Sequence, residues 1–175
     1  MTLPIVIAAL STLLVAVAGG VLTKLTPWYY GLRFPSWKPP DWLFGPAWTV
    51  ILSLACTAAV IGWDEAPDIA TRRILVALFV ANGTLNALWS LFYFRMRRPD
   101  YALVEVCFLQ AVNVLLAWQL YPISHTASLC MAPYIVWVSF AGFLNLTIVR
   151  LNAPFGRAYR PVQTNETVHS GGRHG

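Results

Sequence analysis

Charge is the property that this sequence most clearly lacks. Of its 175 residues, 12 are Lys or Arg and seven are Asp or Glu, so 11% are charged, against about 25% in soluble domains. The mean hydropathy is +0.61, and 58% of the residues are apolar. A soluble fold of this size cannot hide that much apolar surface. The composition therefore excludes a disordered chain, a nucleic-acid-binding tail and an ordinary soluble domain, and predicts one domain surrounded by lipid.

Cysteines and catalytic motifs are also scarce. The three cysteines lie in separate apolar stretches, which predicts small buried side chains and neither disulfides nor a metal site. No Gly-rich phosphate loop, no Ser–His–Asp arrangement and no cluster of metal-ligating residues is present in the sequence. His169 and His174, in the C-terminal segment, are too sparse to indicate a metal site. We therefore expect no metal and no resident cofactor.

Long apolar runs, by contrast, are abundant. The runs cover residues 3–22, 46–63, 74–94, 101–121 and 127–149. Each has about the 20 residues that a helix needs to cross some 30 Å of hydrocarbon, and none shows the alternation of a barrel strand. The sequence therefore predicts an all-α membrane protein, a bundle of five transmembrane helices within residues 1–152. Residues 153–175 are expected to form a poorly ordered tail.

Lys and Arg are distributed unevenly between the connections. Ten of the twelve lie in the first and third connections and the C-terminal segment, whereas only Arg72 and Arg73 lie on the other side. By the positive-inside rule, the N-terminus is outside, and the long first connection and the C-terminus are cytosolic. Both a bacterial inner membrane and a mitochondrial outer membrane fit this orientation.

The first connection is the most unusual segment. Residues 28–48 contain eight aromatic residues, four prolines and the basic residues Arg33 and Lys38. Because proline fixes φ and removes a donor, we expect a stiff segment with little regular structure. Its Trp and Tyr side chains are also typical of a belt at the lipid headgroups. The proline density favours a rigid aromatic lid over a cavity at the cytosolic end of the bundle.

Several polar and aromatic side chains are placed to line such a cavity. Asn86 lies about 12 Å from the cytosolic end of the third span, and Asn82 and Trp89 share its face. Cys107 and Trp137 lie about 9 and 18 Å deep on the fourth and fifth spans. Together they predict an aromatic-walled pocket with a few amide donors. Helix–helix hydrogen bonds are the alternative for each asparagine.

The spans hold one charged residue and a stripe of small residues. Glu105 lies about 6 Å below the cytosolic end of its span. A carboxylate there is a candidate functional group, but the shallow depth favours an ion pair with a nearby arginine, namely Arg95, Arg97 or Arg98. Small residues recur at every fourth position of the first span, at Ala8, Thr12, Ala16 and Gly20. This spacing predicts close contact within the bundle, with a homodimer face as the alternative.

Three motifs resemble the translocator protein family, also called the tryptophan-rich sensory protein or peripheral benzodiazepine receptor family. They are Trp37-Lys-Pro-Pro-Asp-Trp-Leu-Phe-Gly-Pro-Ala-Trp48-Thr, Leu85-Asn86-Ala-Leu-Trp89-Ser and Ala132-Pro133-Tyr134-Ile-Val-Trp137, supported by Asn145 and Arg150-Leu-Asn152. The resemblance covers about residues 3–152. It implies a five-helix bundle, commonly dimeric, with a pocket under the first connection. It also implies binding of porphyrins and other tetrapyrroles, of sterols in some members, and of synthetic benzodiazepine-site ligands.

The resemblance also implies which residues form the pocket. The expected ligand-binding residues are Tyr30, Trp37, Trp48, Asn86, Trp89, Cys107, Trp137 and Ala141. Trp48 and Trp137 match tryptophans linked in bacterial members to light-dependent porphyrin breakdown, which makes them the candidate catalytic residues of an enzyme. Two departures are visible: Ala111 replaces a polar residue of some relatives, and no Tyr precedes Arg150 in the sterol motif. The second departure argues against sterol binding through that motif.

These observations predict a membrane receptor or sensor for a flat, apolar, anionic tetrapyrrole such as protoporphyrin IX or heme. Aromatic walls would supply stacking area, Asn86 a hydrogen bond, and Arg33 or Lys38 contacts to the propionates. A porphyrin-degrading enzyme and a tetrapyrrole or sterol transporter are the alternatives. The absence of an internal repeat and the shallow Glu105 weigh against the transporter. We expect the lipid bilayer and a second copy of the chain as partners, and no nucleic acid.

Overall fold

The computed structural model describes residues 2–156, and every regular element in that range is helical. Its elements are α1 (Thr2–Leu22), α2 (Pro27–Tyr30), α3 (Asp41–Glu65), α4 (Ile69–Ser90), the π-helix η1 (Leu91–Arg95), α5 (Pro99–Leu120), α6 (His125–Cys130) and α7 (Ala132–Asn152). Among the described residues, five helical segments are long and apolar enough to cross a membrane. The predicted all-α, five-span fold is confirmed. The predicted poorly ordered tail lies outside the described residues from position 157 onward.

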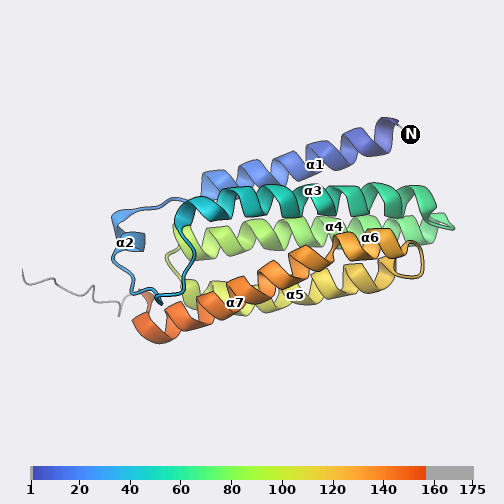
Figure 1. Cartoon of the computed structure of the whole chain (residues 1–175). Helices are drawn as coiled ribbons and strands as arrows, with labels where there is room; N and C mark the ends of the chain where they lie inside the picture. Colours follow the sequence, from blue (N-terminus) through green and yellow to red (C-terminus); the bar gives the residue numbers. More distant parts are fainter. Residues whose placement is uncertain (1, 157–175) are drawn as a thin grey trace, which may run out of the picture.

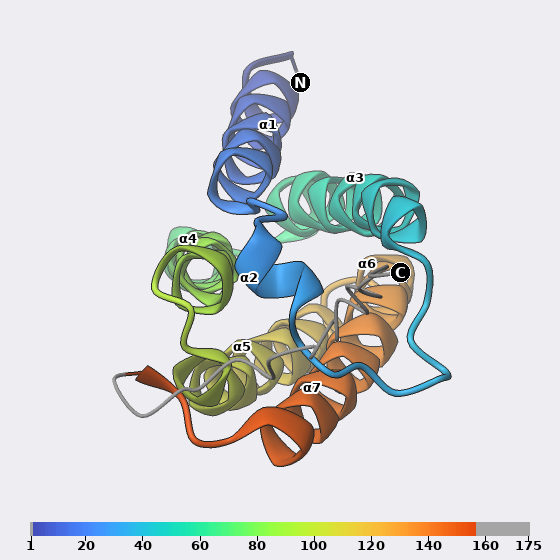
Figure 2. The same cartoon turned by 90° about the vertical axis from the view of Figure 1, so that its left-hand side faces the viewer.

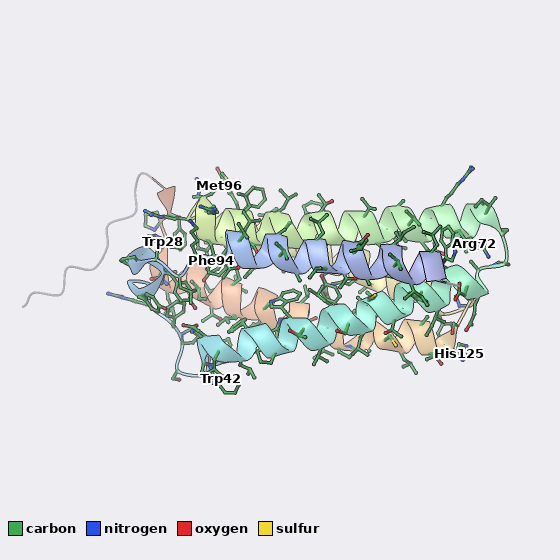
Figure 3. The ribbon with its side chains drawn as sticks, turned by 90° about the horizontal axis from the view of Figure 1, so that it is seen from above. Trp28, Trp42, Arg72, Phe94, Met96 and His125 are labelled. Atoms are coloured by element: carbon green, nitrogen blue, oxygen red, sulfur yellow. The ribbon has the colours of Figure 1, made fainter. Side chains whose placement is uncertain are left out.

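The long helices lie side by side, and successive helices run in opposite directions (Figure 1). Seen end-on, α2 lies over the middle of the bundle, while α1 stands at its outer side (Figure 2). Helix α1 contacts α3 and α4, whereas α5 contacts both α4 and α7. Trp28, Trp42, Phe94 and Met96 lie at one end, which we call the lid end, and Arg72 and His125 at the other, the far end (Figure 3).

The connection between α1 and α3, residues 23–40, forms a lid over one end of the bundle. It is less irregular than expected, because residues Pro27–Tyr30 form α2. Proline at the first helical position supplies a preset φ and loses no hydrogen bond there, so this turn is locally favoured. Helix α3 begins at Asp41, five residues before the predicted start, and it contains Pro46. The acidic Asp41 in the first turn favours this earlier start through the helix dipole.

Two of the predicted spans are interrupted. The helical pattern of α4 continues to Arg95 as the π-helix η1. The fifth span divides at Met131 into α6 and α7. Pro133 explains the second break, because its nitrogen has no hydrogen to donate to the carbonyl of Leu129. Both interruptions leave the path across the bundle nearly straight (Figure 1).

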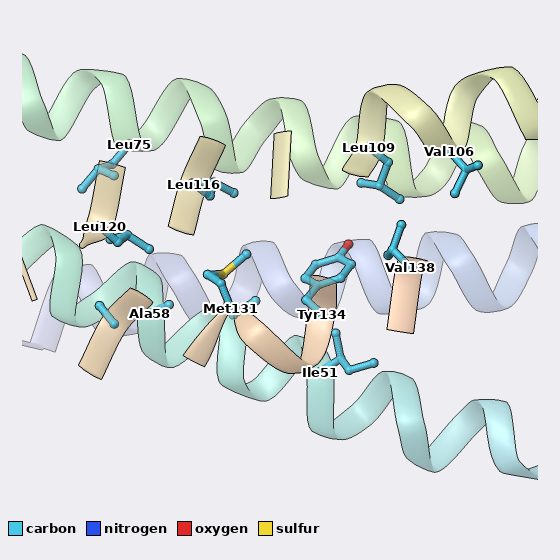
Figure 4. Packing of buried hydrophobic residues seen from close by; sticks show 12 residues of the cluster. Ile51, Ala58, Leu75, Val106, Leu109, Leu116, Leu120, Met131, Tyr134 and Val138 are labelled. Atoms are coloured by element: carbon cyan, nitrogen blue, oxygen red, sulfur yellow. The ribbon is translucent and has the colours of Figure 1, made fainter. Parts of the chain in front are cut away.

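A continuous aliphatic core joins α3, α4, α5, α6 and α7 (Figure 4). Its fully buried members include Ala58, Leu116, Leu120 and Met131, all at 0% exposure. The outer surface is also apolar, with many exposed Leu, Ile, Val, Phe and Trp side chains on the long helices. No residue in the most hydrophobic stretch of α1 is buried. An apolar exterior around an apolar core is what a lipid-solvated helix bundle requires.

Candidate functional site

A cavity of about 800 Å³ lies beneath the lid, between α1, α3, α4 and α7. Its aromatic lining consists of Tyr29, Phe34, Phe44, Trp48, Trp89, Tyr93 and Phe94. Small side chains of α1 complete the opposite wall, at Ala9, Thr12, Ala16, Gly19 and Gly20. The stripe of small residues predicted to form a helix contact therefore also provides room for the cavity. The predicted aromatic-walled hollow is present in this fold.

Charged and aromatic side chains meet at the lid side of the cavity, which we call the mouth. Asp41 Oδ1 accepts hydrogen bonds from Tyr29 Oη at 2.7 Å and from Lys38 Nζ. The Lys38 ammonium also lies over two rings, 4.8 Å from the centroid of Phe34 and 5.7 Å from that of Tyr29. Burial and the hydrogen bond to Asp41 raise the pKa of the Tyr29 phenol, which keeps it a hydrogen-bond donor. These contacts join the lid to the first turn of α3.

The other side of the lid is fastened to the end of α7. The Asn152 side chain donates to the carbonyl of Arg33 and accepts from its amide, both at 2.8 Å. Trp37 stacks on Phe143 with ring centroids 5.3 Å apart and meets Phe140 edge-on. The two hydrogen bonds of Asn152 hold Arg33 of the lid against the C-terminal end of α7. The stacked ring of Trp37 adds a second contact between the lid and α7.

Further polar groups of the cavity wall come from α4 and α7, at Asn86, Ser90 and Asn145. Asn86 Nδ2 donates to Tyr134 Oη at 2.8 Å, which links α4 to α7 across the bundle. Asn86 also lines the cavity, so it both forms a helix–helix hydrogen bond and contributes to the pocket wall. The indole nitrogen of Trp89 is buried without a partner among the described residues. This nitrogen is not exposed to the cavity, so Trp89 offers a ligand only the surface of its ring.

Five of the predicted ligand-contacting residues line the cavity. They are Lys38, Trp48, Asn86, Trp89 and Ala141. They come from the lid, α3, α4 and α7, and only the bundle brings them together. Asn82, predicted on the same face as Asn86, does not line the cavity: its Nδ2 donates to Asn113 Oδ1 on α5 at 2.6 Å.

The remaining predicted residues lie elsewhere. Tyr30 is 63% exposed and meets Tyr29 edge-on from outside. Cys107 is exposed and its thiol lies 3.5 Å from the carbonyl of Leu103, one turn earlier in α5. Arg33 is exposed on the lid, and Trp37 packs on α7 outside the cavity. The depth of Cys107 along its helix does not specify which face of the helix is buried, so depth alone cannot place this side chain in the cavity.

Trp137 occupies an intermediate position. Its ring is half-buried and contacts Phe44, with centroids 5.5 Å apart, and Phe140 at 5.7 Å. Phe44 lines the cavity, whereas Trp137 does not. The indole nitrogen of Trp137 is buried without a partner among the described residues. The indole therefore lies one ring behind the cavity wall.

Glu105 does not form the predicted ion pair. It is 5% exposed, and neither carboxylate oxygen has a partner among the described residues. Arg98, one of the three expected partners, instead binds Asp100 and lies over the ring of Tyr101. The direction of Glu105 around α5 explains the difference, because it points into the bundle rather than along the membrane surface.

Sequence reasoning missed several wall residues. Asp41 and Phe44 line the cavity, and both stand in the first of the three quoted motifs, which did not identify them as pocket residues. Tyr93 and Phe94 also line it, and they lie at the end of the predicted third span. The spacing of Tyr93, four residues after Trp89, was a signal that could have identified it. Tyr93 in fact stacks with Trp89, with ring centroids 5.1 Å apart.

Comparison with known proteins completes this description. The TspO/MBR family matches residues 7–151 of the chain. The tryptophan-rich protein TspO of Chlorobaculum tepidum is 40% identical over 146 residues, which cover 80% of this chain and 90% of that protein. The tryptophan-rich sensory protein of Cereibacter sphaeroides is 30% identical over 133 residues, covering 76% and 82%. The translocator protein of Homo sapiens is 30% identical over 128 residues, covering 71% and 75%.

Proposed function

Because the chain belongs to the TspO/MBR family, we propose that it is a multi-pass membrane receptor or sensor that binds a porphyrin or related tetrapyrrole under the lid. The observation that carries this proposal is the aromatic-walled cavity of about 800 Å³. Small-molecule sites are concave, mostly apolar and about 300–1,000 Å³ in volume. A large, flat, apolar ring is the ligand class that matches such walls.

The walls suggest how the ring is held. Trp48 of α3 and Trp89 of α4 both line the cavity and offer apolar faces for stacking. Asn86 lines the same cavity and supplies a polar group beside these rings. The carboxylate-bearing edge of a porphyrin would then face the mouth, where Lys38 lies.

The setting of this receptor is part of the proposal. The excess of Lys and Arg at the lid end and the C-terminal segment supports an outside N-terminus and a cytosolic lid. A bacterial inner membrane and a mitochondrial outer membrane both meet this requirement. The exposed apolar surface of the helices leaves area for a second copy of the chain, so we propose a homodimer.

A titration of the purified protein in detergent micelles with protoporphyrin IX tests the binding function. Saturable binding, followed by the porphyrin absorbance, is expected for the wild type. Trp48→Ala removes a stacking face and should weaken the affinity about tenfold, or about 1.4 kcal/mol. Trp118→Ala is the matched control, because Trp118 is 75% exposed and does not line the cavity. Absence of saturation in the wild type, or equal losses in both variants, would contradict the proposal.

A porphyrin-degrading enzyme is the second candidate function. The position of Trp137 supports this candidate. Its indole contacts Phe44, which lines the cavity, so one ring separates Trp137 from a bound ligand. Loss of the porphyrin absorbance should then require both light and oxygen. Trp137→Phe should slow this loss and leave the binding affinity nearly as it was. An equal effect on binding and breakdown, or breakdown in the dark, would remove this candidate.

A further inference from the structure

The cavity contains one pair of opposite charges. Among its described lining residues, only Lys38 and Asp41 carry formal charge, and they bind each other at the mouth. The wall therefore has no net charge, although its one cation is the group expected to meet the acidic edge of a tetrapyrrole. A ligand carboxylate that reaches Lys38 must therefore come close to the carboxylate of Asp41, which already binds this lysine.

The ammonium of Lys38 has little room for a second anion. Its side chain is 14% exposed, and its nitrogen lies over the rings of Phe34 and Tyr29 while it donates to Asp41 Oδ1. The rings occupy other sides of the cation. Among the described residues, a displaced Asp41 carboxylate would keep Tyr29 Oη as its one side-chain partner.

We propose that Asp41 is a specificity-determining residue that competes with acidic ligands for Lys38, so that the cavity favours tetrapyrroles whose acidic groups are neutralised over free diacids. The inference rests on the proposed function and specifies its ligand class. Its physical cause is like-charge repulsion between Asp41 and a ligand carboxylate beside a partly buried ion pair, where charges are screened less than in open solvent. The competing attraction to Lys38 is already satisfied by Asp41.

The substitution Asp41→Asn isolates this charge. An asparagine has nearly the same shape and keeps an Oδ1 acceptor for both Tyr29 Oη and Lys38 Nζ, so the lid can keep its contacts. Only the negative charge is lost. Lys38→Met, alone and combined with Asp41→Asn, tests whether the lysine is the group for which the two carboxylates compete.

The experiment measures the affinity of each variant for protoporphyrin IX and for its dimethyl ester in the same micelles at pH 7.4. The two probes share the ring and differ in charge, so their affinity ratio reports the mouth and cancels changes in stacking. Asp41→Asn should raise the diacid-to-ester affinity ratio about tenfold. Lys38→Met in the Asp41→Asn background should remove this gain, and Lys38→Met alone should lower the ratio below that of the wild type.

The outcomes separate the inference from the function on which it rests. An unchanged ratio in Asp41→Asn, or a gain that survives Lys38→Met, would overturn the role of Asp41 while the binding function stands. If neither probe saturates the wild type, both fail together. If Asp41→Asn does not fold, as judged by its thermal unfolding in micelles, Asp41→Ser takes its place: a raised ratio supports the inference and an unchanged one overturns it.

Discussion

The two ends of the bundle use the same helices in opposite ways. At the far end, small and large aliphatic side chains interlock, and a Cβ placed on Gly62 would lie 2.6 Å from Leu120 Cδ2 and 3.2 Å from Leu75 Cδ1. At the lid end, aromatic rings stand around a cavity, and a Cβ placed on Gly45 would meet nothing within 4 Å. Figure 4 shows the interlocked side chains of the core.

This difference shows how one bundle combines rigidity with a binding space. Aliphatic side chains fill the gaps between helices almost completely, because they interdigitate at the density of an organic crystal. Rings such as Trp48 and Phe44 hold neighbouring helices apart, and they pack edge-on against Tyr134 and Trp137. The far end can therefore anchor the helices while the lid end stays hollow. The predictions below test this division.

Overpacking the far end should have the largest effect. Gly62→Leu introduces a side chain where Leu120 and Leu75 leave no room, and we expect a loss of about 3 kcal/mol in stability. Gly45→Leu is the matched control at the lid end and should cost less than about 1 kcal/mol. Thermal unfolding in detergent micelles measures both. Similar losses at the two positions would show that the ends do not differ in packing.

Releasing the lid should have a smaller and local effect. Asn152→Ala removes the two hydrogen bonds to Arg33, which should lower the free energy of local lid opening by about 2 kcal/mol. Hydrogen exchange at the Arg33 amide should accelerate accordingly. Thr147→Ala is the control, because its hydroxyl binds only Phe143 of its own helix. Equal exchange in both variants would contradict the proposed fastening.

Breaking the hydrogen bond between Asn82 of α4 and Asn113 of α5 should have a smaller effect still. Asn82→Ala leaves the buried Asn113 Oδ1 without its donor, and we expect a stability loss of about 1 kcal/mol, as for other interhelical hydrogen bonds in membrane proteins. A double-mutant cycle with Asn113→Ala isolates the interaction. A coupling energy near zero would show that the amide pair does not stabilise the middle of the bundle.

Neutralising Glu105 should have the smallest effect and the opposite sign. Its carboxylate is buried without a partner in the part of the chain that the structure describes, so Glu105→Gln should leave stability unchanged or raise it by up to about 1 kcal/mol. Glu105→Ala is a useful second variant, because it also removes packing volume and should destabilise. A clear loss of stability in Glu105→Gln, measured by thermal unfolding, would indicate a structural partner for the carboxylate.

Much of the site followed from the sequence. The prolines and aromatic residues of residues 28–48 predicted the lid, and the motifs around Trp48, Asn86 and Trp89 identified three residues of the cavity wall. Tyr30 and Cys107, which the resemblance implies as pocket residues, do not line this cavity. Their exposure depends on the rotation of each helix against its neighbours. That rotation is set by contacts between distant segments.

The sequence by itself determined that five apolar helices form, where they end approximately, and that a stiff aromatic segment joins the first two. These properties are local: they depend on hydrophobic runs, prolines and the need to satisfy the backbone within each helix. The tertiary structure alone decided that Asn82 binds Asn113, that Asn152 holds Arg33 and that Glu105 lies in the interior without a partner among the described residues. Each depends on the relative positions of side chains, which hydropathy does not encode.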